Sequence, residues 1–181
     1  MPTHTGNEHL ALVEACEAHL EAYLDFVRAY LPAEDNAFMR RRFEQWLRDP
    51  PAALARARAF ARGRNLPDGF VPETTYWLLR DGRRVVARSS LRHRLTPHLE
   101  HEGGHIGYGV LPSERGKGYG TAVCRLTLER GRDMGLGRVL ITCDADNAAS
   151  ARIIEKNGGV LEDERLSVQT GKVKRRYWVD L

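Results

Sequence analysis

Three alternating glycines constrain this sequence more than any other feature. Gly116, Gly118 and Gly120 lie between a short apolar segment that ends at Pro112 and a helical pattern that continues to Met134. Glycines let backbone N–H groups approach an anion, and the start of a helix adds partial positive charge. The spacing predicts a strand-to-helix turn that can bind phosphate or pyrophosphate, although glycine-rich turns also occur for steric reasons alone.

Two common nucleotide-binding motifs do not fit this turn. A Walker loop needs a glycine where Leu111 stands and a serine or threonine where Gly118 follows Lys117. A dinucleotide fingerprint needs Gly-x-Gly-x-x-Gly at the start of a parallel sheet, whereas the spacing here is Gly-x-Gly-x-Gly and strands of a hairpin come first. The loop therefore belongs to neither class.

The rest of the chain alternates between helical and strand patterns. Strands are expected over residues 10–13, 74–79, 85–87, 105–111 and 138–143, with hairpin turns at Asp81-Gly82 and Thr170-Gly171, and helices before Pro32, within 35–62, from Gly120 to Met134 and after Asn147. A helix connects the strands at 105–111 and 138–143, so these two are expected to be parallel. The fold class is α/β, of the kind with a mixed α+β sheet, and 181 residues without a linker fit one domain over residues 1–181.

Charge and cysteine content exclude several functions. The net charge is +4, but 28 basic and 24 acidic residues are spread along the chain, which indicates a solvated surface more than a nucleic-acid interface. Cys16, Cys124 and Cys143 are too far apart in the sequence to indicate a disulfide framework or a zinc site. The polar N-terminus and the absence of a long apolar run predict a cytoplasmic protein with no membrane partner.

Three motifs in order resemble the GCN5-related N-acetyltransferase (GNAT) family. Arg115-x-x-Gly118-x-Gly120 is similar to its acetyl-CoA loop, Gln/Arg-x-x-Gly-x-Gly/Ala. Val110-Leu111-Pro112 resembles the Val-x-Pro that ends the family's fourth strand, and Asn147-x-x-Ser150 resembles the start of its pantetheine-side helix. Together the motifs cover roughly residues 104–160. Residues 92–95 and 176–178 further resemble a bacterial branch whose substrates are largely unassigned.

The resemblance implies an acyl-CoA-dependent N-acyltransferase with acetyl-CoA, or another acyl-CoA, as cosubstrate and no metal. A primary amine of a small molecule, amino acid or peptide would attack the thioester directly. The implied fold is a mostly antiparallel sheet with a parallel splay between strands four and five and with flanking helices. The residues implied in cofactor binding are Val110, Arg115, Gly116, Lys117, Gly118, Tyr119, Gly120, Thr121, Asn147 and Ser150.

Direct attack needs a base for the amine and a proton source for the departing thiolate. Glu102 and His105, at the start of the fourth strand, are the candidate bases, and each has a structural alternative as a solvated or hydrogen-bonded residue. The family often has a tyrosine acid where this sequence has Ile154. Water, Tyr108 or Tyr177 is then the expected proton source.

The acceptor amine is hard to read from the sequence. Arg92 and His93 could bind an acidic group on it, since a guanidinium pairs well with carboxylate or phosphate, or they could be the polar face of a strand. Tyr108 is a third candidate for this side of the site. A homodimer remains open, because no periodic feature predicts one.

The segment His101-Glu102-Gly103-Gly104-His105 matches the zinc motif His-Glu-x-x-His formally. That motif requires a helix, but two glycines cost about 2 kcal/mol of helix propensity relative to alanine. In an extended chain the two histidines would be roughly 13 Å apart, too far to share a metal. The sequence therefore argues against zinc hydrolysis.

Two alternatives to acetyl transfer stay open. Ile154, in place of the family's tyrosine, would suit a CoA-binding module without catalysis. The excess of basic residues gives weak support to an enzyme that takes its acyl donor from aminoacyl-tRNA.

Overall fold

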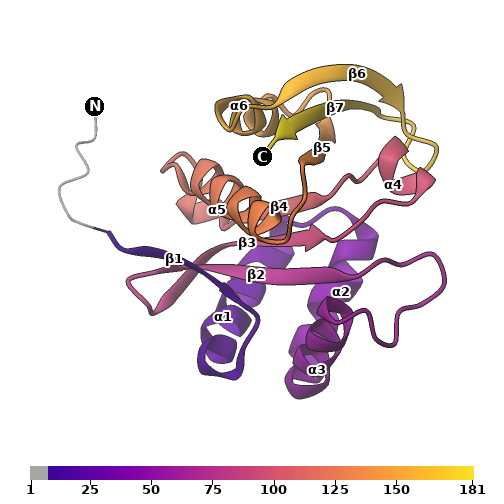
Figure 1. Cartoon of the computed structure of the whole chain (residues 1–181). Coiled ribbons are helices and arrows are strands. Elements are labelled where there is room, and N and C mark those ends of the chain that lie inside the picture. Colours follow the sequence, from indigo (N-terminus) through magenta and orange to yellow (C-terminus); the bar gives the residue numbers. More distant parts are fainter. Residues whose placement is uncertain (1–7) are drawn as a thin grey trace.

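The computed structural model describes residues 8–181 and contains two sheets with helices between and around them (Figure 1). The strands are β1 (Leu10–Glu14), β2 (Glu73–Arg80), β3 (Arg84–Arg92), β4 (Ile106–Val110), β5 (Arg138–Asp144), β6 (Val160–Leu166) and β7 (Val173–Asp180). The α-helices are α1 (Leu20–Tyr30), α2 (Ala37–Arg48), α3 (Pro50–Ala61), α4 (Pro97–His101), α5 (Tyr119–Asp133) and α6 (Ala148–Lys156), and the short 3-10 helices are η1 (Glu17–His19), η2 (Leu31–Ala33) and η3 (Pro112–Glu114). The polar N-terminal segment noted in the sequence lies mostly outside these described residues.

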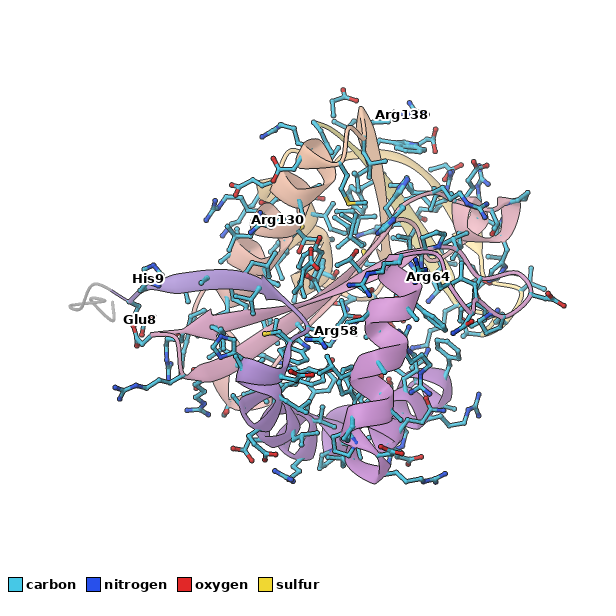
Figure 2. All side chains as sticks on the ribbon, turned by 60° about the horizontal axis from the view of Figure 1, so that its bottom comes forward. Glu8, His9, Arg58, Arg64, Arg130 and Arg138 are labelled. Carbon is cyan, nitrogen blue, oxygen red and sulfur yellow. The ribbon has the colours of Figure 1, made fainter. Side chains whose placement is uncertain are left out.

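The first sheet has the order β1-β2-β3-β4, and every neighbouring pair is antiparallel. The predicted hairpin turns at Asp81 and Gly82, whose φ angles of 52° and 66° suit an Asp-Gly turn. The start of β1 is attached to this turn: His9 donates its backbone N–H to the Asp81 carboxylate and accepts a hydrogen bond from the Asp81 N–H. Figure 2 shows Glu8 and His9 at this end of β1.

Helices cover both faces of the first sheet. Trp77 and Leu79 of β2 pack against α1–α3, whereas Tyr76 and Leu78 pack on the side of α5 and α6. Figure 1 shows α1, α2 and α3 on one side of this sheet and α5 on the other. Burial on both faces explains why residues 76–79 of β2 are apolar in succession instead of alternating with polar residues.

The second sheet has the order β5-β7-β6 and is also antiparallel. The two sheets meet where β4 and β5 begin, because the His105 N–H donates to the Leu140 carbonyl over 2.7 Å. No hydrogen-bonded ladder continues between β4 and β5 in the described chain, so the expected splay is present as a junction followed by divergence. The predicted fold class is confirmed.

The strands and α-helices expected from the sequence are present, and the structure contains one further α-helix. The short helix α4 had not been expected, although Thr96 caps it by accepting a hydrogen bond from the Leu99 N–H and Pro97 occupies its first turn. No helix in residues 8–181 has the length and apolarity needed to cross a membrane.

Candidate functional site

The glycine loop ends in an open helix N-terminus. Gly116 and Gly118 have φ angles of 79° and 89°, and a Cβ on either would have no atom within 4 Å. Gly118 precedes α5 and supplies no side-chain cap. None of the backbone N–H groups from Gly116 to Thr121 donates to an acceptor within residues 8–181. The loop therefore presents a row of unpaired amides at a helix N-terminus, as an anion site requires.

Gly120 brings three elements together at the opening of the sheet. A Cβ at this position would lie 2.5 Å from the Ile153 Cδ1 atom of α6 and 3.6 Å from the Val110 Cγ2 atom of β4. The absence of a side chain thus lets α5 begin directly against α6 and β4. This close packing places the unpaired amides beside the point where β4 leaves β5.

A buried carboxylate beside the glycine loop forms ion pairs that hold the loop in place. Glu114 is 3% exposed and binds Lys117 Nζ at 2.8 Å, Arg80 at 3.3 Å and Arg84 at 3.1 Å. Burial alone would raise the pKa of Glu114, but the Lys117 hydrogen bond and the two arginine charges outweigh it and lower the pKa. Because Lys117 is bound to Glu114, the anion site is formed chiefly by backbone amides.

Tyr108 connects β4 to α6 across the splay. Its hydroxyl is 2.8 Å from the Ser150 Oγ atom and 3.3 Å from the Ser150 carbonyl oxygen. Asn147 caps α6 by accepting a hydrogen bond from the Ser150 N–H over 3.0 Å. Burial raises the pKa of Tyr108, so its hydroxyl keeps its proton at neutral pH. Tyr108 thus lies on the same side as the loop, away from Arg92.

His105 is a structural link between the two sheets. The His105 Nδ1 atom accepts a hydrogen bond from the Leu140 N–H over 2.9 Å, and the His105 backbone N–H donates to the Leu140 carbonyl. Burial and then the nearby positive charge of Arg92 lower its pKa to about 4. Neutral His105 therefore carries its proton on Nε2, so neither ring nitrogen is available to accept a proton from a substrate.

The low pKa of His105 predicts a loss of stability in acid. An unfolded histidine has a pKa near 6.5, so between pH 6.5 and about 4 the unfolded chain binds a proton that the native chain excludes. The free energy of unfolding should fall over this window by up to about 3 kcal/mol. Urea unfolding at several pH values would measure it.

The matched control for this prediction is His105→Gln, whose side-chain carbonyl can still accept from the Leu140 N–H but does not titrate. The difference in unfolding free energy between the two proteins should shrink as the pH falls below 6.5. A difference that stays constant from pH 7 to pH 4.5 would contradict the assignment.

The segment 101–105 is not helical as a whole. The helix α4 ends at His101, Glu102 is extended, and Gly103 and Gly104 have φ angles of 107° and 60°. His101 bonds through Nε2 to the Leu166 carbonyl oxygen, while His105 contacts Leu140. The two histidines therefore have different partners, and no metal-binding group of three His, Cys, Asp or Glu side chains forms within residues 8–181.

Glu102 is the one candidate base with an unpaired atom. It is 7% exposed, and its Oε1 atom is buried without a hydrogen-bond partner in the described chain. Tyr177 differs, because it is 1% exposed in the core between β5 and β6 and its hydroxyl donates to the Glu155 carboxylate over 3.3 Å. The position of the family's tyrosine, Ile154, is fully buried.

Arg92, the last residue of β3, and His93, which follows it, point to opposite faces of the sheet. Arg92 donates to the carbonyl oxygens of Gly103 and Gly104 at 3.1 and 2.8 Å and lies 3.4 Å from Glu73. The His93 Nε2 atom is 2.8 Å from the Thr74 hydroxyl, on the other face. The structure therefore does not bring the two residues together, and Arg92 stabilises the turn that leads into β4.

Arg88, on the same face of β3 as Arg92, was not expected from the sequence. Arg88 is 8% exposed, and its Nε atom is buried without a partner in the described chain. The available signal was the alternation of Arg88, Ser90 and Arg92 along the strand, which places three polar residues on a face otherwise packed with aromatic rings.

A separate pocket of about 250 Å³ lies between α2, α3 and the segment before β2. It is lined by aromatic rings and arginines, among them Phe60, Phe70, Arg41 and Arg56. None of the residues predicted to bind the cofactor or to act in catalysis lines it.

The structure thus combines a glycine loop of unpaired amides at a helix N-terminus, which can bind an anion, with a mixed α+β fold whose sheets separate beside it. The sequence model of the acetyltransferase (GNAT) domain matches residues 9–160. The chain belongs to the GNAT acetyltransferase family. A comparison with curated protein sequences gives no match.

Several solved structures share the fold. RimL, a ribosomal L7/L12 alpha-N-protein acetyltransferase in complex with CoA, is 18% identical with a TM-score of 0.67, covering 95% of this chain and 94% of its own. Mycobacterium smegmatis RimJ, in complex with CoA-disulfide, is 16% identical with a TM-score of 0.69, covering 94% and 81%. The microcin C7 self immunity acetyltransferase MccE, in complex with acetyl-CoA and AMP, is 15% identical with a TM-score of 0.66, covering 97% and 94%. At these identities the likeness concerns the fold alone.

Proposed function

We propose that the chain transfers an acetyl group from acetyl-CoA to a primary amine of a small molecule, an amino acid or a peptide. The observation that carries the proposal is the row of unpaired amides from Gly116 to Thr121 at the start of α5. These amides and the helix dipole would bind the pyrophosphate of the donor. The similar structures of RimL and MccE hold CoA and acetyl-CoA, which supports this donor.

The pantetheine arm would continue from the loop into the space between β4 and β5. In the described chain β4 is an edge strand, with β3 as its ladder partner on one side and no strand paired on the other. The free backbone groups of β4 can therefore pair with the amide groups of the arm. Asn147 and Ser150, at the start of α6, would face the arm from the opposite side, and Arg115 would add charge near the phosphates. The thioester would then lie beside β4 near Tyr108 and Val110.

Reaction requires the neutral amine to attack the thioester carbonyl and the CoA thiolate to leave with a proton. Glu102 suits the base, acting through water, because its buried Oε1 atom has no partner within residues 8–181. Tyr108 suits the proton donor, because its neutral hydroxyl lies between β4 and α6. His105 would hold the two sheets together at the start of the splay, and Tyr177 would remain a packing residue.

Tyr108→Phe should lower kcat by roughly tenfold to a hundredfold, because the thiolate would lose its proton donor. The dissociation constant for acetyl-CoA should change little, since the phenyl ring keeps its packing. Steady-state kinetics together with calorimetry of acetyl-CoA binding would separate the two effects. In Tyr177→Phe, which removes the hydroxyl bonded to Glu155, kcat should stay near that of the unaltered protein. Equal losses in both variants would exclude Tyr108 as a specific donor.

The direct test of the function combines two measurements on the full chain. Calorimetry with acetyl-CoA measures donor binding, and release of free CoA thiol is followed with a panel of amino acids, small amines and peptide N-termini. Binding together with turnover of at least one amine class is expected. Failure to bind acetyl-CoA would refute the proposal.

A second candidate function is a CoA-binding module without catalysis. The fully buried Ile154, at the position of the family's tyrosine, favours it. Acetyl-CoA binding without turnover across the whole panel would support this module over the enzyme. We further propose that residues 1–181 act as one domain in the cytoplasm without a metal.

A further inference from the structure

Arg88 is a buried arginine without a counter-ion. It lies in the middle of β3, between Trp77 of β2 and Gly109 of β4 in the strand register. Its Nε atom has no hydrogen-bond partner, and no carboxylate of residues 8–181 forms an ion pair with its guanidinium. The two other arginines on this side differ: Arg42 binds Glu73 at 2.9 Å, and Arg92 lies 3.4 Å from the same carboxylate.

The Phe43 ring of α2 lies against the Arg88 guanidinium on the side of α1 and α2. Its Cζ atom lies 5.8 Å from the centre of the Phe43 ring, and the Phe43 and Tyr30 rings are 5.3 Å apart. The Tyr30 hydroxyl would be 2.6 Å from a Cβ on Gly109, so this tyrosine reaches the β4 backbone. The guanidinium thus lies in a mostly apolar environment in which water competes weakly for its N–H groups.

A charge in such a place destabilises the free protein unless an anion balances it. Contact with the Phe43 ring compensates in part. Glu73 is already shared by Arg42 and Arg92, so this side of the sheet carries three guanidinium groups for one buried carboxylate. The missing negative charge is most simply supplied by a ligand.

The position of Arg88 relates that ligand to the transferred acetyl group. Gly109 pairs with Arg88 across the sheet and precedes Val110, beside which the pantetheine arm would lie. Directly paired residues of antiparallel strands have Cα atoms about 5 Å apart. The helices α5 and α6 cover the donor side, whereas the Arg88 side chain, under α1 and α2, keeps 8% exposure, so the acceptor would approach from the side of Arg88. An anion on Arg88 would then be only a few bonds from the attacking nitrogen.

We propose that Arg88 binds the anionic group of the acceptor, and that the acceptor is a primary amine with a carboxylate or phosphonate close to the nitrogen, as in an α-amino acid. This inference rests on the proposed function and narrows its substrate class. Glu73, which is paired with Arg42 and Arg92, forms no ion pair with Arg88 within residues 8–181. The forked guanidinium suits the bidentate geometry of either anion.

The test compares matched acceptors that differ only in charge. Thiol release is measured with amino acids, with the corresponding amino acid amides and with aminophosphonates. The unaltered protein should have a kcat/KM for the charged acceptor on the order of tenfold to a hundredfold above that for the amide. In Arg88→Met this ratio should approach one, and Arg88→Lys should restore part of it. A comparison of the aminophosphonates with the amino acids shows which of the two anions the site prefers.

The control variant is Arg132→Met, which removes an exposed charge from the end of α5 and should leave the ratio unchanged. Acetyl-CoA calorimetry on Arg88→Met checks that the variant is folded. A ratio near one in the unaltered protein, or a ratio that Arg88→Met retains, overturns the proposal.

A binding experiment separates this proposal from the proposed function. N-acetylglycine and its uncharged amide are titrated into the protein in the presence of CoA. Binding of N-acetylglycine that Arg88→Met abolishes supports the anion site even if no amine is acetylated, in which case the transferase proposal alone fails. Equal affinity for the acid and the amide contradicts the anion site whatever the turnover.

Discussion

Gly118→Ala is expected to weaken acetyl-CoA binding about tenfold or more. Gly118 has a φ angle of 89° directly before α5, and a residue with a Cβ loses roughly 1–2 kcal/mol in the left-handed region. The loop would relax by rotating its amides away from their common direction, and each 1.4 kcal/mol lost in binding is a factor of ten. Calorimetry with acetyl-CoA would measure the dissociation constant, and urea unfolding would measure stability.

The matched control is Gly135→Ala, at the opposite end of the same helix. Gly135 has a φ angle of 79°, and a Cβ added there would have no atom within 4 Å, as at Gly118. The two variants should therefore lose similar stability, on the order of 1 kcal/mol, while only Gly118→Ala loses affinity. If both variants bound acetyl-CoA as well as the unaltered protein, the amides of the loop would not be the anion site.

The secondary structure could be predicted because its signals are local. The Asp81-Gly82 turn, the stop after Gly135 and the cap at Asn147 each depend on residues within a few positions of one another. The helix α4 was missed although Thr96-Pro97 is a start signal, because a helix of five residues contains little periodicity.

The proposed donor side could be read from the sequence for the same reason, and its role in binding stays a prediction. The loop from Arg115 to Gly120 and the start of α6 are continuous segments, and their chemistry belongs largely to the backbone. Long-range contributions include Ile153, whose approach explains why Gly120 lacks a side chain, and Arg80 and Arg84, which bind Glu114.

The sequence could not show which polar side chains of β3 are free to bind an acceptor, because long-range pairing decides which polar groups are already satisfied. Arg92 was a good candidate by residue type, but it bonds to Gly103 and Gly104. Arg88 is the same residue type, but within residues 8–181 its Nε atom has no partner, while Glu73 pairs with Arg42 and Arg92. Periodicity places both arginines on one face of β3 but cannot distinguish them. His105 likewise acquires its role from Leu140, 35 residues away.

Gly104→Ala is expected to destabilise the fold more than any other single glycine-to-alanine change at the site, by about 3 kcal/mol. Gly104 has a φ angle of 60°, and a Cβ there would lie 2.5 Å from the Leu140 carbonyl oxygen, which is backbone and cannot move aside cheaply. The left-handed backbone costs roughly 1–2 kcal/mol and the overlap a further 1–3 kcal/mol. Urea unfolding at neutral pH would measure the loss.

The control Gly69→Ala separates backbone strain from overlap, since Gly69 has a φ angle of 80° with no atom within 4 Å of the added carbon. Gly104→Ala should exceed it by the cost of the overlap. The same change pushes Leu140 away from His105, so the only backbone hydrogen bond that joins β4 to β5 in the described chain would lengthen. Acetyl-CoA affinity should then fall together with stability, whereas Gly69→Ala should leave it intact. Equal destabilisation by the two variants would mean that the junction tolerates separation, and that the close contact of β4 with β5 does not determine where the sheet opens for the donor.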